Sequence, residues 1–103
     1  MKLALIQTTC HDESEARKIA KVLIEQSFAA CVQMTPIESF YKWKGEFCSD
    51  KEVLLNIKTK MKNFEKVKSK IKELHSYDVP EIICIEIEKS SKEYKEFINK
   101  SCW

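Results

Sequence analysis

The side chain best placed to do chemistry in this sequence is His75, at the end of a predicted helix. An imidazole there can belong to a binding site, or it can cap the helix, because the helix dipole favours a cationic ring at the C-terminus. Tyr77 and Glu81 follow in a polar and aromatic turn that leads into the last predicted strand. The sequence leaves both roles open for His75.

The five cysteines are an odd number, lie far apart and include no Cys-x-x-Cys pair. Metal chaperones with a Met-x-Cys-x-x-Cys loop need two neighbouring thiols, whereas Cys10 stands alone after the first strand. We therefore expect reduced thiols and a cytoplasmic protein, since the N-terminal apolar run is too short for a signal peptide. Cys31 and Cys84 lie in apolar runs and are expected to pack as small hydrophobic residues. Cys10 and Cys48 are expected to be exposed, and Cys102 to lie near a mobile end.

The charge balance predicts neither a nucleic-acid partner nor a membrane partner. Eighteen basic and sixteen acidic side chains give a net charge of +2, which is too close to neutrality to indicate either. RNA-binding sheets need stacking aromatic residues on their central strands, which segments 3–8 and 52–59 lack. The lysine-rich run 58–72 could attract phosphate backbones or other anionic ligands, but a solvated helix face is the interpretation we favour. No nucleophile is paired with a base at a recognisable spacing, so we expect a binding protein rather than an enzyme.

Hydrophobic periodicity predicts the elements that position these residues, within one domain spanning residues 1–103. Strands are predicted at 3–9, at 28–34 and on past Pro36 to Trp43, at 52–59 and at 82–87. Helices are predicted at 16–25, at 64–74 and around 94–98. Asp12 or Ser14 can cap the first helix, whose charged residues, Glu15 included, are expected to face water.

This order, β-α-β-β-α-β with a C-terminal helix, predicts an α+β, ferredoxin-like fold in which two helices cover one face of a four-stranded antiparallel sheet. The only glycine, Gly45, lies where two extended runs meet, so we expect a long hairpin that turns there with positive φ. Pro36 cannot donate to a ladder and marks a bulge or a sheet edge. Tyr41 and Trp43 fall on the face that helices leave uncovered, and such a face requires a partner.

Several segments, taken together, carry a family resemblance. They are Ala30-Cys31-Val32, Ser39 to Gly45, Glu52, Lys58-Thr59 and His75 to Glu81. The Tyr-x-Trp-x-Gly hairpin and the His-x-Tyr-x-x-Pro turn, found in one chain in this order, resemble the CutA family of divalent-cation tolerance proteins. The resemblance implies a cytosolic homotrimer of ferredoxin-like subunits, similar in shape to PII signalling proteins, with clefts between subunits.

The resemblance also implies a role in tolerance of divalent metals, with copper or another divalent cation as the ion. Family members proposed to bind copper use a cysteine in the first strand and two histidines at the end of the second helix. This sequence has Gln7 and Leu74 at two of those places, which leaves His75 as the metal ligand to expect. One imidazole alone is a poor copper site, so three copies or a thiol from a neighbouring chain would have to help.

A second interpretation of the matched polar residues is a cleft between subunits that binds a small anion or metabolite, as in a PII-like signalling or scaffold protein. Its predicted lining residues are Tyr41, Trp43, Glu52, Lys58, Tyr77 and Glu81. The lysine would supply positive charge, the two glutamates would orient it, and the aromatic rings would form apolar walls. Alternatively, Glu52 and Lys58 form an interface salt bridge that sets register.

Overall fold

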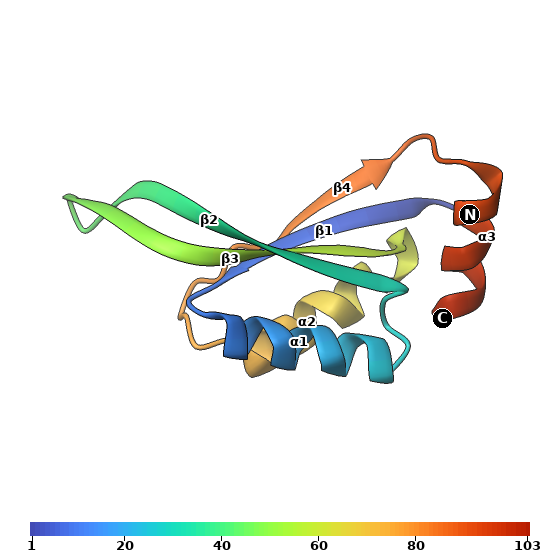
Figure 1. The fold of residues 1–103 in the computed structure, drawn as a ribbon, viewed down its shortest axis with the longest axis horizontal. Coiled ribbons are helices and arrows are strands. Elements are labelled where there is room, and N and C mark those ends of the chain that lie inside the picture. The colour runs from blue at the N-terminus through green and yellow to red at the C-terminus, as the bar shows by residue number, and fades with distance from the viewer.

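The computed structural model describes all 103 residues, and its strands form one antiparallel sheet in the order β2-β3-β1-β4 (Figure 1). The strands are β1 (Leu3–Cys10), β2 (Cys31–Trp43), β3 (Glu46–Lys60) and β4 (Ile83–Ile87). The helices are α1 (Glu13–Glu25), α2 (Phe64–Leu74) and α3 (Lys92–Ser101), with a 3-10 turn at Met61–Asn63 before α2. The predicted order of elements and the antiparallel sheet are confirmed.

Helices α1 and α2 lie side by side on one face of the sheet (Figure 1), which we call the helix face. Alternate strand residues point toward these helices because side chains along a strand alternate between the two faces. The resulting core contains Ala4, Ile6 and Cys10 of β1, Leu55 and Ile57 of β3, Ile19 and Leu23 of α1, and Val67 and Ile71 of α2. These positions follow the predicted two-residue and three-to-four-residue spacings.

The hairpin between β2 and β3 extends beyond the helices as a long arm (Figure 1). The two strands pair from Cys31 to Trp43 without a break, and the chain turns through Lys44 and Gly45, with φ of 52° and 81°. Positive φ at Gly45 is therefore confirmed, and it is the backbone conformation that glycine adopts at least cost. Pro36 lies inside β2, which is an edge strand. Of the two predicted alternatives, a bulge or a sheet edge, the sheet edge is confirmed.

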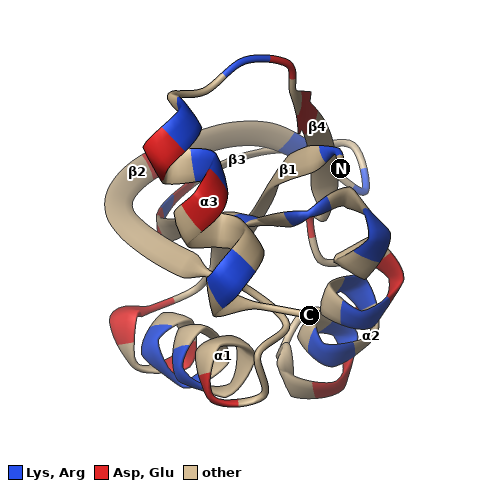
Figure 2. Ribbon diagram, turned by 90° about the vertical axis from the view of Figure 1, so that its right-hand side faces the viewer, with Lys and Arg blue, Asp and Glu red and all other residues tan.

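Lysines recur along α2 (Figure 2), none of those in the helix is buried, and two of them form ion pairs along it. Lys68 pairs with Glu65 at 2.9 Å and Lys70 with Glu73 at 2.7 Å. These pairs, three residues apart, are the usual support of a solvated helix. The interpretation as a solvated helix face holds for the lysines of α2, but not for Lys58 and Lys60, which lie on β3, where Lys60 is buried.

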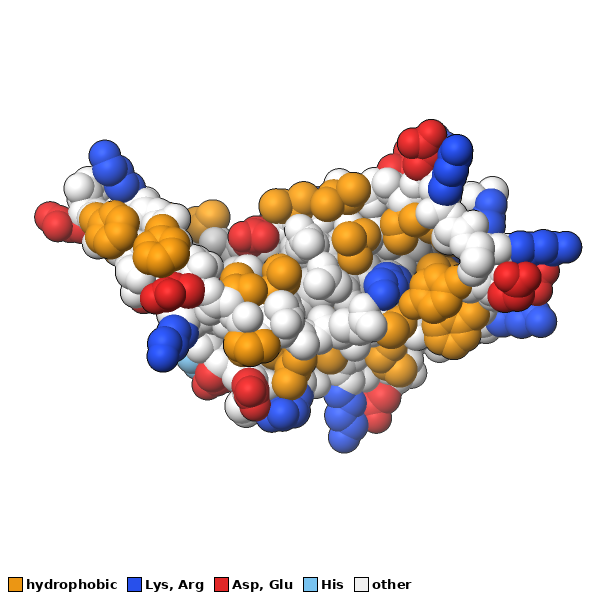
Figure 3. All heavy atoms as spheres, turned by 45° about the horizontal axis from the view of Figure 1, so that its top comes forward, with side chains coloured by type: hydrophobic (Ala, Val, Ile, Leu, Met, Phe, Trp, Pro, Cys, Tyr) orange, Lys and Arg blue, Asp and Glu red, His pale blue; other side chains and the backbone are white.

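The opposite face of the sheet, which we call the open face, is covered by α3 at one end only. There Leu3 packs with Ile98 and Cys102, so the prediction of a mobile end at Cys102 was wrong. Over the rest of this face many apolar side chains reach the surface (Figure 3), among them Ile83 and Ile85, which are 45% and 46% exposed. The predicted uncovered apolar face is present in this chain.

Candidate functional site

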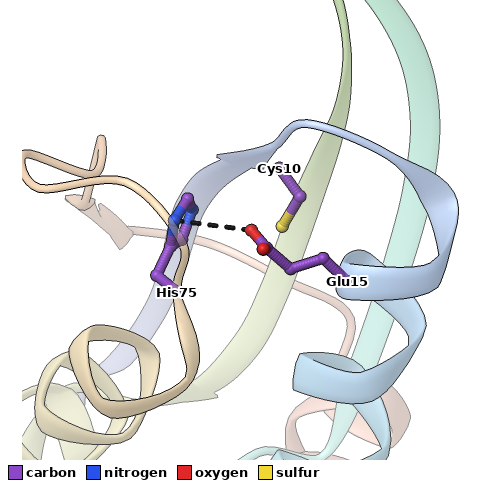
Figure 4. Close-up of side chains that lie close together, drawn as sticks. All are labelled: Cys10, Glu15 and His75. Carbon is purple, nitrogen blue, oxygen red and sulfur yellow. Dashed lines mark ion pairs between the residues drawn. The ribbon is translucent and has the colours of Figure 1, made fainter.

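Three residues from three different elements meet where β1 ends. Cys10 is the last residue of β1, Glu15 lies in the first turn of α1, and His75 is the C-cap of α2. One sulfur, one carboxylate oxygen and one ring nitrogen of these residues lie within 4.8 Å of one another, and the side chains point toward one another (Figure 4). We call this group the Cys10 cluster.

His75 is held by two hydrogen bonds, one to each ring nitrogen. Its Nε2 lies 2.7 Å from the carbonyl oxygen of Thr9, and its Nδ1 accepts from the backbone N–H of Tyr77 at 3.1 Å. A carbonyl can only accept, so Nε2 carries the proton and Nδ1 presents its lone pair. The side chain is fully buried. His75 thus occupies the C-cap position of α2, one of the two roles that the sequence left open, while its role in a binding site stays a prediction.

Glu15 is the carboxylate of the cluster, and the expectation that it faces water was wrong. Its side chain is only 9% exposed, and its Oε2 lies 3.3 Å from Nδ1 of the exposed His11. Its Oε1 is buried and accepts no hydrogen bond, although it lies 3.4 Å from Nδ1 of His75. The reason is helical spacing: Glu15 stands four residues before the buried Ile19 and therefore shares its face.

Cys10 is fully buried, which corrects the expectation of an exposed thiol. Alternation along β1 places it on the helix face, after Ala4, Ile6 and Thr8. Burial, followed by the nearby Glu15 carboxylate, raises the pKa of the Cys10 thiol to about 12. A nucleophilic cysteine needs a lowered pKa. Cys10 is thus a protonated, packed thiol.

Two phenol–carboxylate pairs lie next to the cluster, on the open face. Tyr77 donates to Glu52 Oε2 at 2.7 Å, and Tyr41 donates to Asp50. Burial and the bond to Glu52 raise the pKa of Tyr77 well above its usual range, while the bond to Asp50 raises the pKa of Tyr41 to about 12. The ring of Tyr77 also packs against His75, with 4.7 Å between centroids. The structure thus brings Tyr77 and Glu52 together, as expected for one site.

The other predicted lining residues lie elsewhere in the subunit. Lys58 is six residues beyond Glu52 on β3, where it donates to Gln33 at 2.6 Å and lies 5.6 Å from the ring centre of Tyr94. Trp43 is at the tip of the arm, half exposed, and Glu81 is exposed before β4. Within this chain, Lys58 and Trp43 therefore do not lie beside Glu52.

Comparison with known proteins decides the family. The CutA1 divalent ion tolerance family matches residues 4–101. The Divalent-cation tolerance protein CutA of Thermus thermophilus is 40% identical over 98 residues, which cover 94% of this chain and 95% of that protein. This chain belongs to the CutA1 divalent ion tolerance family.

Solved structures of CutA1 proteins superpose closely on this chain. The crystal structure of CutA1 from Oryza sativa has a TM-score of 0.97 at 32% identity, covering 100% of this chain and 95% of that one. The structure of CutA from Archaeoglobus fulgidus, described as periplasmic, has a TM-score of 0.94 at 36% identity, covering 96% and 97%. The α+β fold is therefore that of the CutA1 family. None of the helices here has the length and apolarity needed to cross a bilayer.

The Cys10 cluster fits a divalent metal by its donor set. A thiol, an imidazole and a carboxylate are the ligands that zinc and copper ions use in proteins, and the unpartnered Oε1 of Glu15 is a buried acceptor that lacks a cation or donor. Gln7 and Leu74, which stand where family members proposed to bind copper have ligands, do not contribute to the cluster. Gln7 donates to Asn56 at 2.9 Å on the open face, and Leu74 packs against the core.

Two members of the cluster, Cys10 and Glu15, were missed as site residues by sequence reasoning. The signal that could have found Cys10 is the alternation of side chains along β1. It places every second residue on the helix face, up to Cys10 at the end of the strand. The signal for Glu15 is a carboxylate on the buried face of an amphipathic helix, where a charge needs a partner. Neither signal names the partner, because the end of α2 is sixty residues further along the chain.

Proposed function

We propose that this CutA1-family chain works as a homotrimer that binds a divalent cation, copper being the ion to test first, and so contributes to metal tolerance by binding rather than catalysis. The observation that carries the proposal is the open face. Ile83 and Ile85 stand nearly half exposed there, beside an arm that carries Trp43. A contiguous apolar face of this kind marks a protein interface.

Ferredoxin-like subunits can bury this face by packing their sheets around a threefold axis. The strand order β2-β3-β1-β4, with two helices on one face, supports the ferredoxin-like description. The arm supports assembly as well, because its outer residues have no core of their own: Tyr41, Trp43 and Phe47 are 42%, 52% and 72% exposed. An isolated two-stranded hairpin is marginally stable in water, so a neighbouring subunit is its natural support.

Clefts between the subunits of such a trimer would bring the separated polar residues together. Glu52 and Lys58 are six residues apart on one strand, roughly 20 Å at the usual rise. Only Glu52 or Lys58 from another copy could then complete a compact site. The proposed lining residues stay Tyr41, Trp43, Glu52, Lys58, Tyr77 and Glu81.

A second candidate function is PII-like binding of a small anionic metabolite in these clefts. Lys58 favours it, since its ammonium lies on the open face beside Tyr94 and is neutralised by no carboxylate in the subunit. We also propose a cytoplasmic location, because all five cysteines carry free thiols and such thiols persist in reducing compartments. The Archaeoglobus relative described as periplasmic marks the alternative.

Oligomeric state tests the assembly. Light scattering should give a mass about three times 12.1 kDa at micromolar concentration. Ile85→Asp should shift the mass toward the monomer, because it places a charge in the proposed interface. The matched control is Ile24→Asp, which alters an equally exposed isoleucine on α1. A monomeric parent protein, or equal effects of the two variants, would remove the assembly from the proposal.

Ligand titration separates the two binding functions. Calorimetry with Cu²⁺ should show stoichiometric binding if the protein handles metal. If a metabolite is the ligand, Cu²⁺ binding should be absent, and an anion screen by thermal shift should find a compound whose protection is lost in Lys58→Ala. Binding of neither class would overturn both functions.

A further inference from the structure

We infer that Cys10, Glu15 and His75 form a divalent transition-metal site inside each subunit. The inference rests on the proposed function, because it identifies where the divalent cation is held. It differs in location, since the ligands come from β1, α1 and the end of α2 of a single chain rather than from a cleft between subunits. Figure 4 shows the three side chains converging on one point.

One of the two hydrogen bonds of His75, that of Nε2 to a backbone carbonyl, is of the kind that orients metal-binding histidines. Histidines that bind metals usually donate the second ring N–H to a carbonyl or carboxylate, which fixes both the tautomer and the ring orientation. Here Nε2 is bonded to the carbonyl of Thr9 at 2.7 Å, so the lone pair is on Nδ1. That nitrogen faces the Glu15 carboxylate, 3.4 Å away. A metal would replace the 3.1 Å bond from the Tyr77 N–H.

Glu15 supplies the second, independent observation. Its side chain is more than nine-tenths buried, its Oε1 is aimed into the cluster (Figure 4), and this oxygen accepts no hydrogen bond. A buried carboxylate oxygen without a partner costs free energy, because it has lost its water and gained nothing in return. A cation between Oε1, Nδ1 and the Cys10 sulfur would satisfy it.

The donor set selects the class of ion. One sulfur, one nitrogen and one oxygen suit Zn²⁺, Co²⁺ or Cu²⁺, whereas Ca²⁺ and Mg²⁺ need oxygen ligands throughout. Zinc-type bonds of about 2.0 to 2.3 Å require the three donors to approach closer than their present 4.8 Å limit. Rotation of the Glu15 and Cys10 side chains provides that movement. On binding, the sulfur–metal bond replaces the S–H bond and the proton leaves to the solvent, while water fills the fourth position.

Cobalt is the probe for this site, because a Co²⁺–thiolate bond gives a charge-transfer band that other ligands do not. The parent protein should show this band and the visible bands of four-coordinate cobalt. Cys10→Ser should abolish the charge-transfer band. The matched control is Cys48→Ser, which removes a thiol of the arm and should leave the spectrum unchanged. Glu15→Gln should weaken Co²⁺ binding by roughly ten-fold or more, and circular dichroism should show that each variant is folded.

A surface site is the competing outcome. His11 is exposed, lies 3.0 Å from Asp12, and could bind cobalt with no cysteine involved. His11→Ala is therefore run in parallel. If it abolishes binding while Cys10→Ser does not, the inference is overturned.

Failure here and failure of the proposed function are distinguishable. If the protein is a trimer and its Cys10→Ser variant binds Co²⁺ as tightly as the parent, the proposed function stands and the internal site is overturned. A Cys10-dependent cobalt band in a monomer establishes the internal site and overturns the proposed assembly. A protein with no thiolate band at any cobalt concentration overturns the internal site, whatever its oligomeric state.

Discussion

The phenol of Tyr77 donates a 2.7 Å hydrogen bond to the carboxylate of Glu52, which ties the turn after α2 to the middle of β3. The same turn carries the backbone N–H that binds Nδ1 of His75. One tyrosine therefore connects the open face, through its side chain, with the Cys10 cluster, through its main chain. A change at this residue is expected to affect both regions.

Removing the Tyr77 hydroxyl should destabilise the subunit. Tyr77→Phe keeps the ring against His75 but leaves the half-buried Glu52 carboxylate without its donor, which we expect to cost about 1 kcal/mol in the free energy of unfolding. Urea denaturation measures the loss. Tyr41→Phe is the control, because its partner Asp50 is exposed on the arm and water can replace the phenol. Equal losses of stability in the two variants would contradict a larger contribution from the Tyr77–Glu52 hydrogen bond.

Alkaline pH should weaken the fold through the same residue. The pKa of Tyr77 is raised from its ordinary 10.0 by burial and by the bond to Glu52, so above pH 10 the folded state holds a proton that the unfolded state has released. Stability must then fall as pH rises above 10. Urea denaturation from about pH 9 to 11 should show the stability difference between the parent and Tyr77→Phe shrinking. A constant difference would show that Tyr77 titrates normally.

The arm should contribute to self-association more than to subunit folding. Trp43→Ala removes a large side chain that is half exposed in the subunit, and an interface aromatic commonly contributes a few kcal/mol to binding. We expect the mass in solution to fall while the far-ultraviolet circular dichroism is kept. Ile24→Ala, on the helix layer, is the control and should leave the mass unchanged. An unchanged mass for Trp43→Ala would place the interface elsewhere.

Sequence periodicity was sufficient to predict the order of elements, because each core face repeats its own spacing. It failed where a segment has no core face. Residues 46–51 of the arm show no alternation of apolar and polar side chains, so β3 was predicted from residue 52, although the structure has it from Glu46 by pairing with β2. The packing of α3 over Leu3 and the burial of Cys102 also depend on where the chain end lies in space.

The candidate site was only partly predictable for a related reason. His75 was identified because its surroundings are polar and its place at a helix end is local information. Cys10 was assigned to water at the segment after the first predicted strand, and Glu15 as a charged residue of the first predicted helix. Their neighbours in space decide their environment instead. Convergence of three chain segments is a tertiary property, and no single window of sequence contains it.

A buried amide should help to hold the C-terminal segment in place. Asn63 is 1% exposed, and its Nδ2 donates to the carbonyl oxygen of Trp103 and to Thr59 Oγ1, each at 3.1 Å. Asn63→Ala leaves these acceptors unpaired, so we expect a loss of about 1 to 3 kcal/mol in thermal or urea unfolding. Lys62→Ala, at the exposed neighbouring position, should have almost no effect. Amide hydrogen exchange in α3 should be faster in Asn63→Ala than in the parent and in Lys62→Ala. Equal exchange rates in all three proteins would contradict a role of Asn63 in holding the C-terminal segment.

Thiol reactivity should separate Cys10 from Cys48 in the native protein. Cys10 is fully buried and its pKa is raised to about 12, first by burial and then by Glu15, so little reactive thiolate is present at neutral pH. Cys48 lies on the arm and is partly exposed. Timed alkylation followed by mass spectrometry should label Cys48 at least about ten times faster. In concentrated urea the two rates should become similar, which controls for intrinsic reactivity. Equal rates in the native protein would mean that Cys10 is open to solvent, contrary to the packing of β1 against α1.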